Sequence, residues 1–272
     1  MPKTILITGA TDGIGLETAK TLVSLGHTVL LHGRNPAKLE RVEKALSSLP
    51  NGGEVESYVA DLSDLSAVAA LAKAVAERHT GLDVLINNAG VFKISNPTTR
   101  DGLDARFVVN TIAPFLLMQR LLALFPSSGR IVNLSSAAQA PVDLQALAGQ
   151  VKLSDDFAAY AQSKLALTMW SRGMALSLQD NGPLVVAVNP GSMLGTKMVK
   201  DAFGASGKDI SIGSDILTRA ALSDEFATAS GQYFDNDTGQ FASPHPDAVS
   251  SQKIEEIVRA IEAILVKVTQ TG

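Results

Sequence analysis

The sequence predicts an α/β fold in which a doubly wound parallel sheet carries helices on both faces. Two observations lead to this prediction. Short runs rich in β-branched residues alternate with longer segments of helical spacing, and a glycine-rich turn follows the first of these runs. Alternating β and α units of this size need right-handed crossovers, which make neighbouring strands parallel and cover both faces of the sheet.

The regular part of the chain extends to about residue 189. Its predicted strands are short and apolar, as buried strands are; they are residues 4–8, 28–32, 55–60, 84–87, 130–135 and 185–189. Its predicted helices are residues 14–25, 37–49, 65–78, 103–124 and 157–178. No change in composition marks a domain boundary, so residues 1–272 are predicted to form a single domain.

The rest of the chain departs from this rhythm. Residues 137–156 form a long connection, and residues 192–230 contain predicted helices at 193–203 and 214–226. These two largely apolar segments are predicted to wall a substrate site. A short strand at 232–234 and a helix at 252–268 follow. The apolar stripe of that helix predicts packing against the sheet, with a subunit interface as the alternative.

Composition excludes several classes of site. The chain has a formal net charge of −4 and no cysteine, which excludes disulfides, iron–sulfur clusters and thiolate zinc sites. The four histidines lack the spacing of metal ligands, so no metal is predicted. The mildly acidic balance gives no electrostatic reason to bind nucleic acid or an anionic membrane. Since neither a signal-peptide pattern nor a long apolar run is present, we expect a cytoplasmic protein.

The turn after the first strand is the first candidate binding site. Glycine lets the backbone turn tightly and approach a ligand closely, and the N-terminus of the next helix attracts a diphosphate. A plain tight turn is the alternative, but a place between the first strand and the first helix favours a dinucleotide. The predicted contacts from this turn are Gly9, Thr11, Asp12, Gly13, Ile14 and Gly15.

The end of the second strand predicts which dinucleotide is bound. Arg34, followed by Asn35, stands where an acidic residue would bind a free ribose 2′-hydroxyl. A guanidinium binds phosphate through two hydrogen bonds, so NADP(H) is predicted over NAD(H). Lys38 could add positive charge, whereas Asp12 would oppose the phosphate. A solvated arginine is the alternative.

The ends of the third and fourth strands extend the predicted cofactor site. Asp61 and Leu62 follow the third strand, where a carboxylate can meet the edge of the adenine and a leucine its face. The alternative for Asp61 is an N-cap of the following helix. Asn88, Ala89 and Gly90 follow the fourth strand, and their small size allows close approach to the ribose.

Tyr160 and Lys164 are the candidate proton-transfer pair. They lie four residues apart in a helical segment, which places both side chains on one helix face. A phenol in water has a pKa of ~10, and a nearby ammonium together with a cationic nicotinamide would lower it toward neutrality. The pair would then supply a general acid for carbonyl reduction or a base for alcohol oxidation, with an exposed helix pair as the alternative.

Taken together, these motifs resemble the short-chain dehydrogenase/reductase family, and the gap before Tyr160 is similar to its retinol-dehydrogenase-like branch. The motifs occur in family order over residues 4 to about 235: Thr8-Gly9-x-x-x-Gly13-x-Gly15, Asn87-Asn88-Ala89-Gly90, Asn110, Ser135-Ser136, Tyr160-x-x-x-Lys164 and Asn189-Pro190-Gly191. The resemblance implies a Rossmann-type sheet in the order 3-2-1-4-5-6-7 and a nicotinamide cofactor. The branch handles apolar alcohols and aldehydes.

The resemblance also implies roles for individual residues. Tyr160 would transfer the proton, Lys164 would bind the nicotinamide ribose, and Ser136 rather than Ser135 would bind the substrate oxygen. Asn110 would complete the catalytic set. Beyond the sixth strand, Pro190, Gly191 and Thr196 would contact the cofactor, although Thr196 lies one position later than the family pattern.

Asn110 also carries a prediction from the residues themselves. Pro114, four residues later, has no N–H to give to the Asn110 carbonyl. A water held by that carbonyl could link Lys164 to solvent, and a helix kink is the alternative.

The sequence therefore predicts an NADP(H)-dependent oxidoreductase acting on an apolar carbonyl or alcohol. The resemblance makes a homodimer or homotetramer plausible through the helices beginning near Leu103 and Phe157. Two alternatives stay open: an NADP(H)-binding sensor or scaffold without turnover, and an epimerase or dehydratase on the same fold.

Overall fold

The computed structural model describes residues 1–271, whose strands form an eight-stranded sheet in the order β3-β2-β1-β4-β5-β6-β7-β8. The strands are β1 Thr4–Ile7, β2 Thr28–Gly33, β3 Val55–Val59, β4 Val84–Asn87, β5 Arg130–Leu134, β6 Leu184–Asn189, β7 Tyr233–Asp235 and β8 Gln240–Ala242. The predicted parallel order of the first seven is confirmed. The antiparallel β8 was not predicted, because a three-residue strand is too short to show a period-2 pattern.

Up to residue 178 the helices follow the predicted segments closely except at residues 103–124 and at the unpredicted α6, whereas α8 begins four residues after the start of the predicted 193–203 and α9 lies three to four residues before the predicted 214–226. They are α1 Gly13–Ser24, α2 Pro36–Ser47, α3 Leu65–Arg78, α4 Ala105–Phe107, α5 Ala113–Leu121, α6 Leu144–Leu147, α7 Asp156–Leu178, α8 Lys197–Phe203, α9 Ser211–Leu222 and α10 Ser251–Thr271. Polar caps explain several starting points: Asp12 caps α1, Asn35 caps α2 and Asp64 caps α3.

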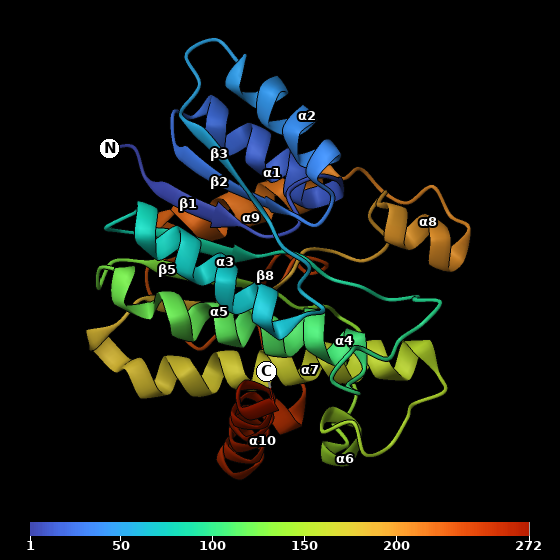
Figure 1. Ribbon diagram of the computed structural model, residues 1–272. Helices are drawn as coiled ribbons and strands as arrows, with labels where there is room; N and C mark the ends of the chain where they lie inside the picture. The colour runs from blue at the N-terminus through green and yellow to red at the C-terminus, as the bar shows by residue number, and fades with distance from the viewer. Residues whose placement is uncertain (272) are drawn as a thin grey trace.

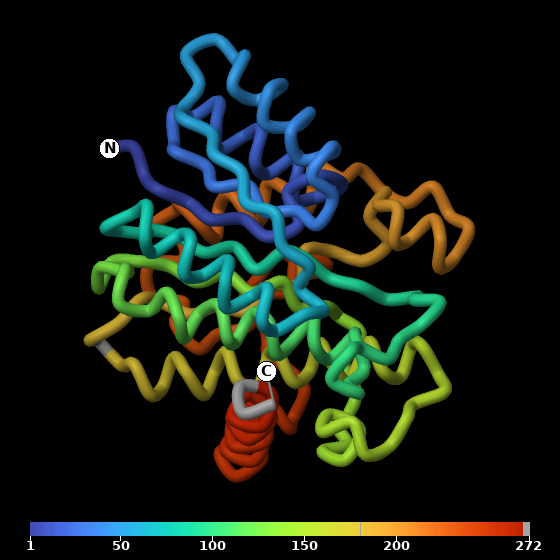
Figure 2. The backbone as a smooth tube through the Cα atoms, in the orientation of Figure 1, coloured from blue at the N-terminus to red at the C-terminus, as the bar shows by residue number. Residues whose placement is uncertain are grey.

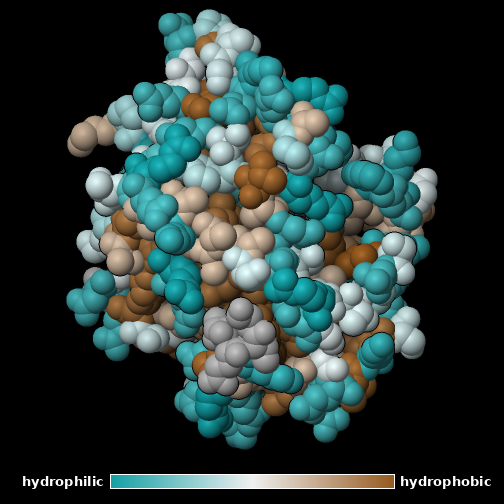
Figure 3. All heavy atoms as spheres, in the orientation of Figure 1, coloured by the Kyte–Doolittle hydropathy of each residue, from teal (hydrophilic) through white to brown (hydrophobic). Residues whose placement is uncertain are grey.

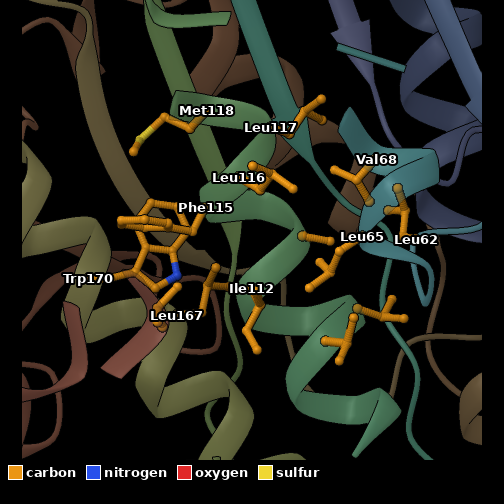
Figure 4. Packing of buried hydrophobic residues seen from close by; sticks show 14 of the residues in the cluster. Leu62, Leu65, Val68, Ile112, Phe115, Leu116, Leu117, Met118, Leu167 and Trp170 are labelled. Atoms are coloured by element: carbon orange, nitrogen blue, oxygen red, sulfur yellow. The ribbon is translucent and has the colours of Figure 1, made fainter. Parts of the chain in front are cut away.

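Helices cover both faces of the sheet (Figure 1). Because side chains alternate along a strand, Leu6 joins the core under α3, α5 and α7, whereas its neighbours Ile5 and Ile7 join the core under α1 and α9. Figure 4 shows the first of these cores, where Phe115 of α5 meets Trp170 of α7 edge to face, with ring centroids 5.4 Å apart. Both faces are thus buried, as a parallel sheet requires.

The helix predicted at residues 103–124 is interrupted by a π-helical turn at Val108–Ile112. Pro114 lies just beyond this turn, near the start of α5, and lacks the N–H that a regular helix would direct to Asn110. Residues Ala105–Leu124 are long and apolar enough to span a membrane by length and composition, but most of this stretch is buried in the fold. It is the central helix of the core in Figure 4.

Two predictions about the outer elements were wrong. The final helix, α10, packs against α7 rather than against the sheet, because α3, α5 and α7 already fill that face. The two helices approach closely at Gly173 of α7, where a Cβ would sit 2.6 Å from a methyl group of Ile254 in α10. In the segment 137–156, α6 buries Leu147 in the core, and Ala138 is the residue of this segment that lines the substrate cavity.

Candidate active site

A cavity of about 900 Å³ lies at the carboxyl ends of the strands, where doubly wound sheets bind ligands. Its walls combine the glycine turn, the ends of β2 to β6, the start of α7 and the segment 189–203. Figure 2 shows the glycine turn and the segment before α8 side by side, although they are far apart in sequence. Every residue of the predicted cofactor set lines this cavity except Gly15.

Gly9 and Gly15 serve the turn in different ways. Gly9 has φ of +68° and lies against Ala89, whose Cα would be 2.9 Å from a Cβ at this position. A Cβ on Gly15 would sit 2.3 Å from the Gly9 carbonyl oxygen. Asn88 braces the same turn by donating to the carbonyl oxygens of Thr8 and Gly9 at 2.8 and 3.1 Å. The absence of a Cβ at Gly15 therefore lets α1 pack on the turn, and its absence at Gly9 lets the turn pack against the residues after β4.

His32 is a further brace of this turn, and sequence reasoning missed it. The Gly9 N–H donates to His32 Nδ1 at 3.2 Å, so the proton lies on Nε2, which is 3.0 Å from the Ala60 carbonyl oxygen. Burial lowers the pKa of His32 to about 4, which keeps the imidazole neutral and able to accept from Gly9. The only signal in the sequence was a histidine inside a buried strand.

We expect His32 to make stability depend on pH between about 6.5 and 4. In the unfolded chain this histidine has the ordinary pKa of 6.5, so over this range it binds a proton that the native His32 does not bind. The free energy of unfolding therefore falls as the pH falls, by about 3 kcal/mol for a shift of this size. Urea unfolding at pH 7 and pH 4 should show a smaller decrease in His32→Gln than in the native protein; equal decreases would contradict the assignment.

The residues after β2 and β3 form the polar end of the cavity. Arg34 lines it, and its guanidinium has no hydrogen bond or ion pair with any residue in 1–271. The Lys38 ammonium lies 3.9 Å from the Asp12 carboxylate. It partly offsets the negative charge of Asp12, which would otherwise repel a phosphate. Asp61 is not the cap of α3, since its carboxylate accepts from the N–H and hydroxyl of Ser63 at 2.9 and 2.8 Å. The Arg34 guanidinium thus lines the cavity with its N–H groups available to a ligand.

Tyr160, Lys164 and Ser136 meet at the opposite end. Lys164 Nζ donates to the Leu134 carbonyl oxygen at 2.7 Å and lies 5.7 Å from the centre of the Tyr160 ring. Burial lowers the pKa of Lys164 to about 8. The predicted lowering of the Tyr160 pKa is not found in the protein alone: burial raises the pKa of the phenol, and a hydrogen bond with the Ser136 hydroxyl opposes that rise. At neutral pH the phenol is protonated.

The two adjacent serines point to different partners. The Ser135 hydroxyl lies 2.6 Å from the Thr168 hydroxyl and donates to the Lys164 carbonyl oxygen at 3.3 Å, so it ties β5 to α7. The Ser136 hydroxyl accepts from the Ala138 N–H at 3.1 Å and reaches Tyr160. Both serines line the cavity, and the Ser136 hydroxyl is the one that reaches the Tyr160 phenol.

Asn110 does not line the cavity; its side chain positions the elements that do. Its side chain accepts from the Val91 N–H at 2.8 Å and donates to the Val91 carbonyl oxygen and the Ser163 hydroxyl, both at 2.9 Å. Ser163 in turn donates to the Tyr160 carbonyl oxygen at 2.7 Å. The π-helical turn thus places one amide so that it joins the end of β4 to the turn of α7 that carries Tyr160.

The loop after β6 is held from outside by the β7–β8 hairpin. The Asp237 carboxylate accepts from the Ser192 N–H at 2.8 Å and from Asn189 Nδ2 at 2.9 Å. Burial acts to raise the pKa of Asp237, but the hydrogen bonds from Ser192 and Asn189 outweigh it and the pKa lies below its usual value. Farther along, Met193 has φ of +58°, and Thr196 caps α8 while its side chain faces Gly13.

We expect Asp237→Ala to weaken dinucleotide binding by about tenfold, because Ser192 and Asn189 lose a charged acceptor. Titration of the dinucleotide would measure the dissociation constant, and thermal unfolding would report stability. Glu262→Ala, an exposed change of equal charge on α10, is the control. Unchanged binding in Asp237→Ala would show that the hairpin does not position this loop.

Comparison with known proteins agrees with this geometry. The short chain dehydrogenase family model matches residues 3–206. The chain is 32% identical to retinol dehydrogenase 13 of Homo sapiens, over 96% of this chain and 82% of that protein. A solved structure of an uncharacterized protein from Mycobacterium Paratuberculosis has a TM-score of 0.80 and 26% identity, covering 96% of this chain and 92% of the other. Landomycin C-6 ketoreductase, solved with NADP and rabelomycin, has a TM-score of 0.68 and 27% identity, covering 87% and 95%.

The matched segment contains the glycine turn, the end of β5 and the Tyr160–Lys164 pair, which are the parts that build the cavity. The chain therefore belongs to the short-chain dehydrogenase/reductase family, in its retinol-dehydrogenase-like branch, and is an oxidoreductase acting on CH–OH groups.

Proposed function

We propose that this protein transfers a hydride between NADP(H) and an apolar carbonyl or alcohol, with Tyr160 as the acid or base. One observation carries the proposal: a protonated phenol and a buried amine lie in the same cavity as a glycine turn that leaves room for a diphosphate. When bound, the nicotinamide supplies or accepts the hydride. The fit rests on Gly9 and Gly13, which line the cavity without side chains, and on Lys164, whose amine donates to one carbonyl oxygen and has further N–H groups for a ribose hydroxyl.

In the direction of reduction, residues of this chain supply one proton to the substrate. The Tyr160 phenol, protonated at neutral pH, donates to the carbonyl oxygen of the substrate. The Ser136 hydroxyl hydrogen-bonds the same oxygen and holds it beside the phenol. Lys164, charged below about pH 8, stabilises the phenolate that remains. Asn110 and Ser163 hold the helical turn from which Tyr160 acts.

Preference for NADP(H) is proposed from Arg34, whose guanidinium is uncommitted and faces the cavity. We expect Arg34→Ala to raise the KM for NADPH by about tenfold to a hundredfold and to change the KM for NADH little, because a charged hydrogen bond to phosphate contributes ~1.5–3 kcal/mol. Steady-state kinetics with both dinucleotides measure this. Arg41→Ala, on the exposed side of α2, is the matched control. Equal loss with both dinucleotides would contradict a 2′-phosphate contact.

The function itself is tested by a panel of carbonyls and alcohols followed by NADPH absorbance. Net consumption of NADPH with a carbonyl supports the oxidoreductase. Conversion of substrate without net consumption would indicate the epimerase or dehydratase alternative. A dinucleotide-dependent change of protein partner without turnover would indicate the sensor or scaffold.

The cytoplasmic location and the homodimer or homotetramer stay predictions. Helix α10 covers part of α7, one of the two helices predicted to meet a second subunit. The other helix predicted to meet a second subunit, residues 103–124, includes α5. Figure 3 shows hydrophobic residues interspersed with hydrophilic ones over α3 and α5.

A further inference from the structure

Three phenylalanine rings lie near Tyr160 at the substrate end of the cavity, with Phe92 in contact with each of the other rings. Phe92 follows β4, Phe157 lies one turn before Tyr160 on α7, and Phe203 ends α8; all three line the cavity. The Phe92 ring meets the Tyr160 ring edge to face with centroids 5.0 Å apart. It also meets Phe157 edge to face at 6.3 Å and stacks with Phe203 at 5.9 Å. The four rings form one continuous aromatic group.

The rings differ in how much they are covered. Phe92 is 8% exposed, whereas Phe157 and Phe203 are 51% and 55% exposed. The protein leaves about half of each outer ring uncovered, beside the group proposed to transfer the proton. Aromatic rings favour offset-stacked or edge-to-face partners beyond what burial of apolar area alone provides. The open surfaces of Phe157 and Phe203 are thus suited to a flat, unsaturated ligand.

Two lysines help to hold α8 at this end of the cavity. Lys93 Nζ donates to the Ala202 carbonyl oxygen at 3.2 Å, which holds the end of α8 beside Phe92. Lys197 pairs with Asp201 on α8. These contacts fix Phe203, the last residue of α8, beside Phe92.

We propose that the substrate is an aromatic carbonyl compound, or the corresponding alcohol, whose ring lies against Phe157 and Phe203 while its oxygen reaches Tyr160 and Ser136. This inference deepens the proposed function and rests on it. Phe92 is the fixed element, held by the Tyr160 ring and by α8. Phe157 and Phe203 are the residues that select aromatic over saturated substrates.

The test compares 2-naphthaldehyde with decahydronaphthalene-2-carbaldehyde, which has the same carbon skeleton but no aromatic ring. The ratio of their kcat/KM values with NADPH is measured in the native protein, in Phe157→Leu and in Phe203→Leu. Leucine keeps an apolar side chain and removes the ring, so each variant should lower the ratio about threefold to tenfold. Phe125→Leu, at the amino ends of the strands, should leave the ratio unchanged. An unchanged ratio in both cavity variants would overturn the proposal.

A binding measurement separates this inference from the proposed function. Calorimetric titration of both aldehydes into Tyr160→Phe with NADP⁺ reports recognition without turnover. Tighter binding of the aromatic aldehyde, lost in the two leucine variants, supports the aromatic site even if no carbonyl is reduced. Reduction of both aldehydes with equal binding of both would refute the aromatic site and leave the oxidoreductase intact.

Discussion

Tyr160→Phe is expected to lower NADPH-dependent carbonyl reduction by about a thousandfold while dinucleotide binding is retained. The variant removes the phenolic hydroxyl and keeps the ring that packs against Phe92 at 5.0 Å. General acid catalysis by a positioned side chain contributes ~10²–10⁴-fold, and the variant removes the group proposed to supply it. Steady-state kinetics measure the loss, and a titration of NADPH measures binding.

The matched control is Tyr58→Phe, because the Tyr58 hydroxyl lies on β3 and bonds Glu56 at 3.1 Å, away from the cavity. The pH profile gives a second readout. Because burial lowers the pKa of Lys164 to about 8, reduction should be steady below that pH and decline above it as the ammonium is lost. Near-native turnover by Tyr160→Phe would remove the phenol from the mechanism.

Gly15→Ala is the second large effect that we expect. The new Cβ would lie 2.3 Å from the Gly9 carbonyl oxygen and 2.4 Å from Asn88 Nδ2. The oxygen belongs to backbone that cannot rotate away, so the glycine turn must shift and the Asn88 brace must break. We expect a loss of about 3 kcal/mol in the free energy of unfolding, at the upper end of overpacking effects, and dinucleotide binding too weak to measure by titration.

Gly81→Ala is the control for this change. A Cβ on Gly81 would come no closer than 4.0 Å to its nearest neighbour, the Leu124 carbonyl oxygen, and its φ is not positive. The variant should fold and bind dinucleotide like the native protein. If Gly15→Ala did the same, the close packing of α1 on the glycine turn would not be needed for binding.

Much of the fold was predictable because local patterns are regular. Helix α3 begins and ends where the spacing of its apolar residues predicted, at Leu65 and Arg78. The cofactor end was predictable for a similar reason: Gly9, Arg34 and Asn88 each follow a strand, and the carboxyl ends of parallel strands meet at one edge of the sheet. Short elements escaped prediction. Strand β8 has three residues, and it forms because β7 offers an open edge.

The alternating pattern of strands and helices, the glycine turn and the Tyr160–Lys164 spacing are properties of the sequence alone, since each depends on residues near one another in the chain. The tertiary structure decided which of the Ser135 and Ser136 hydroxyls reaches Tyr160, how burial shifts the pKa values of His32, Tyr160 and Lys164, and that the hairpin carrying Asp237 holds the loop after β6. These outcomes depend on which distant groups exclude water from a side chain or supply its hydrogen bonds, and chain spacing does not encode that.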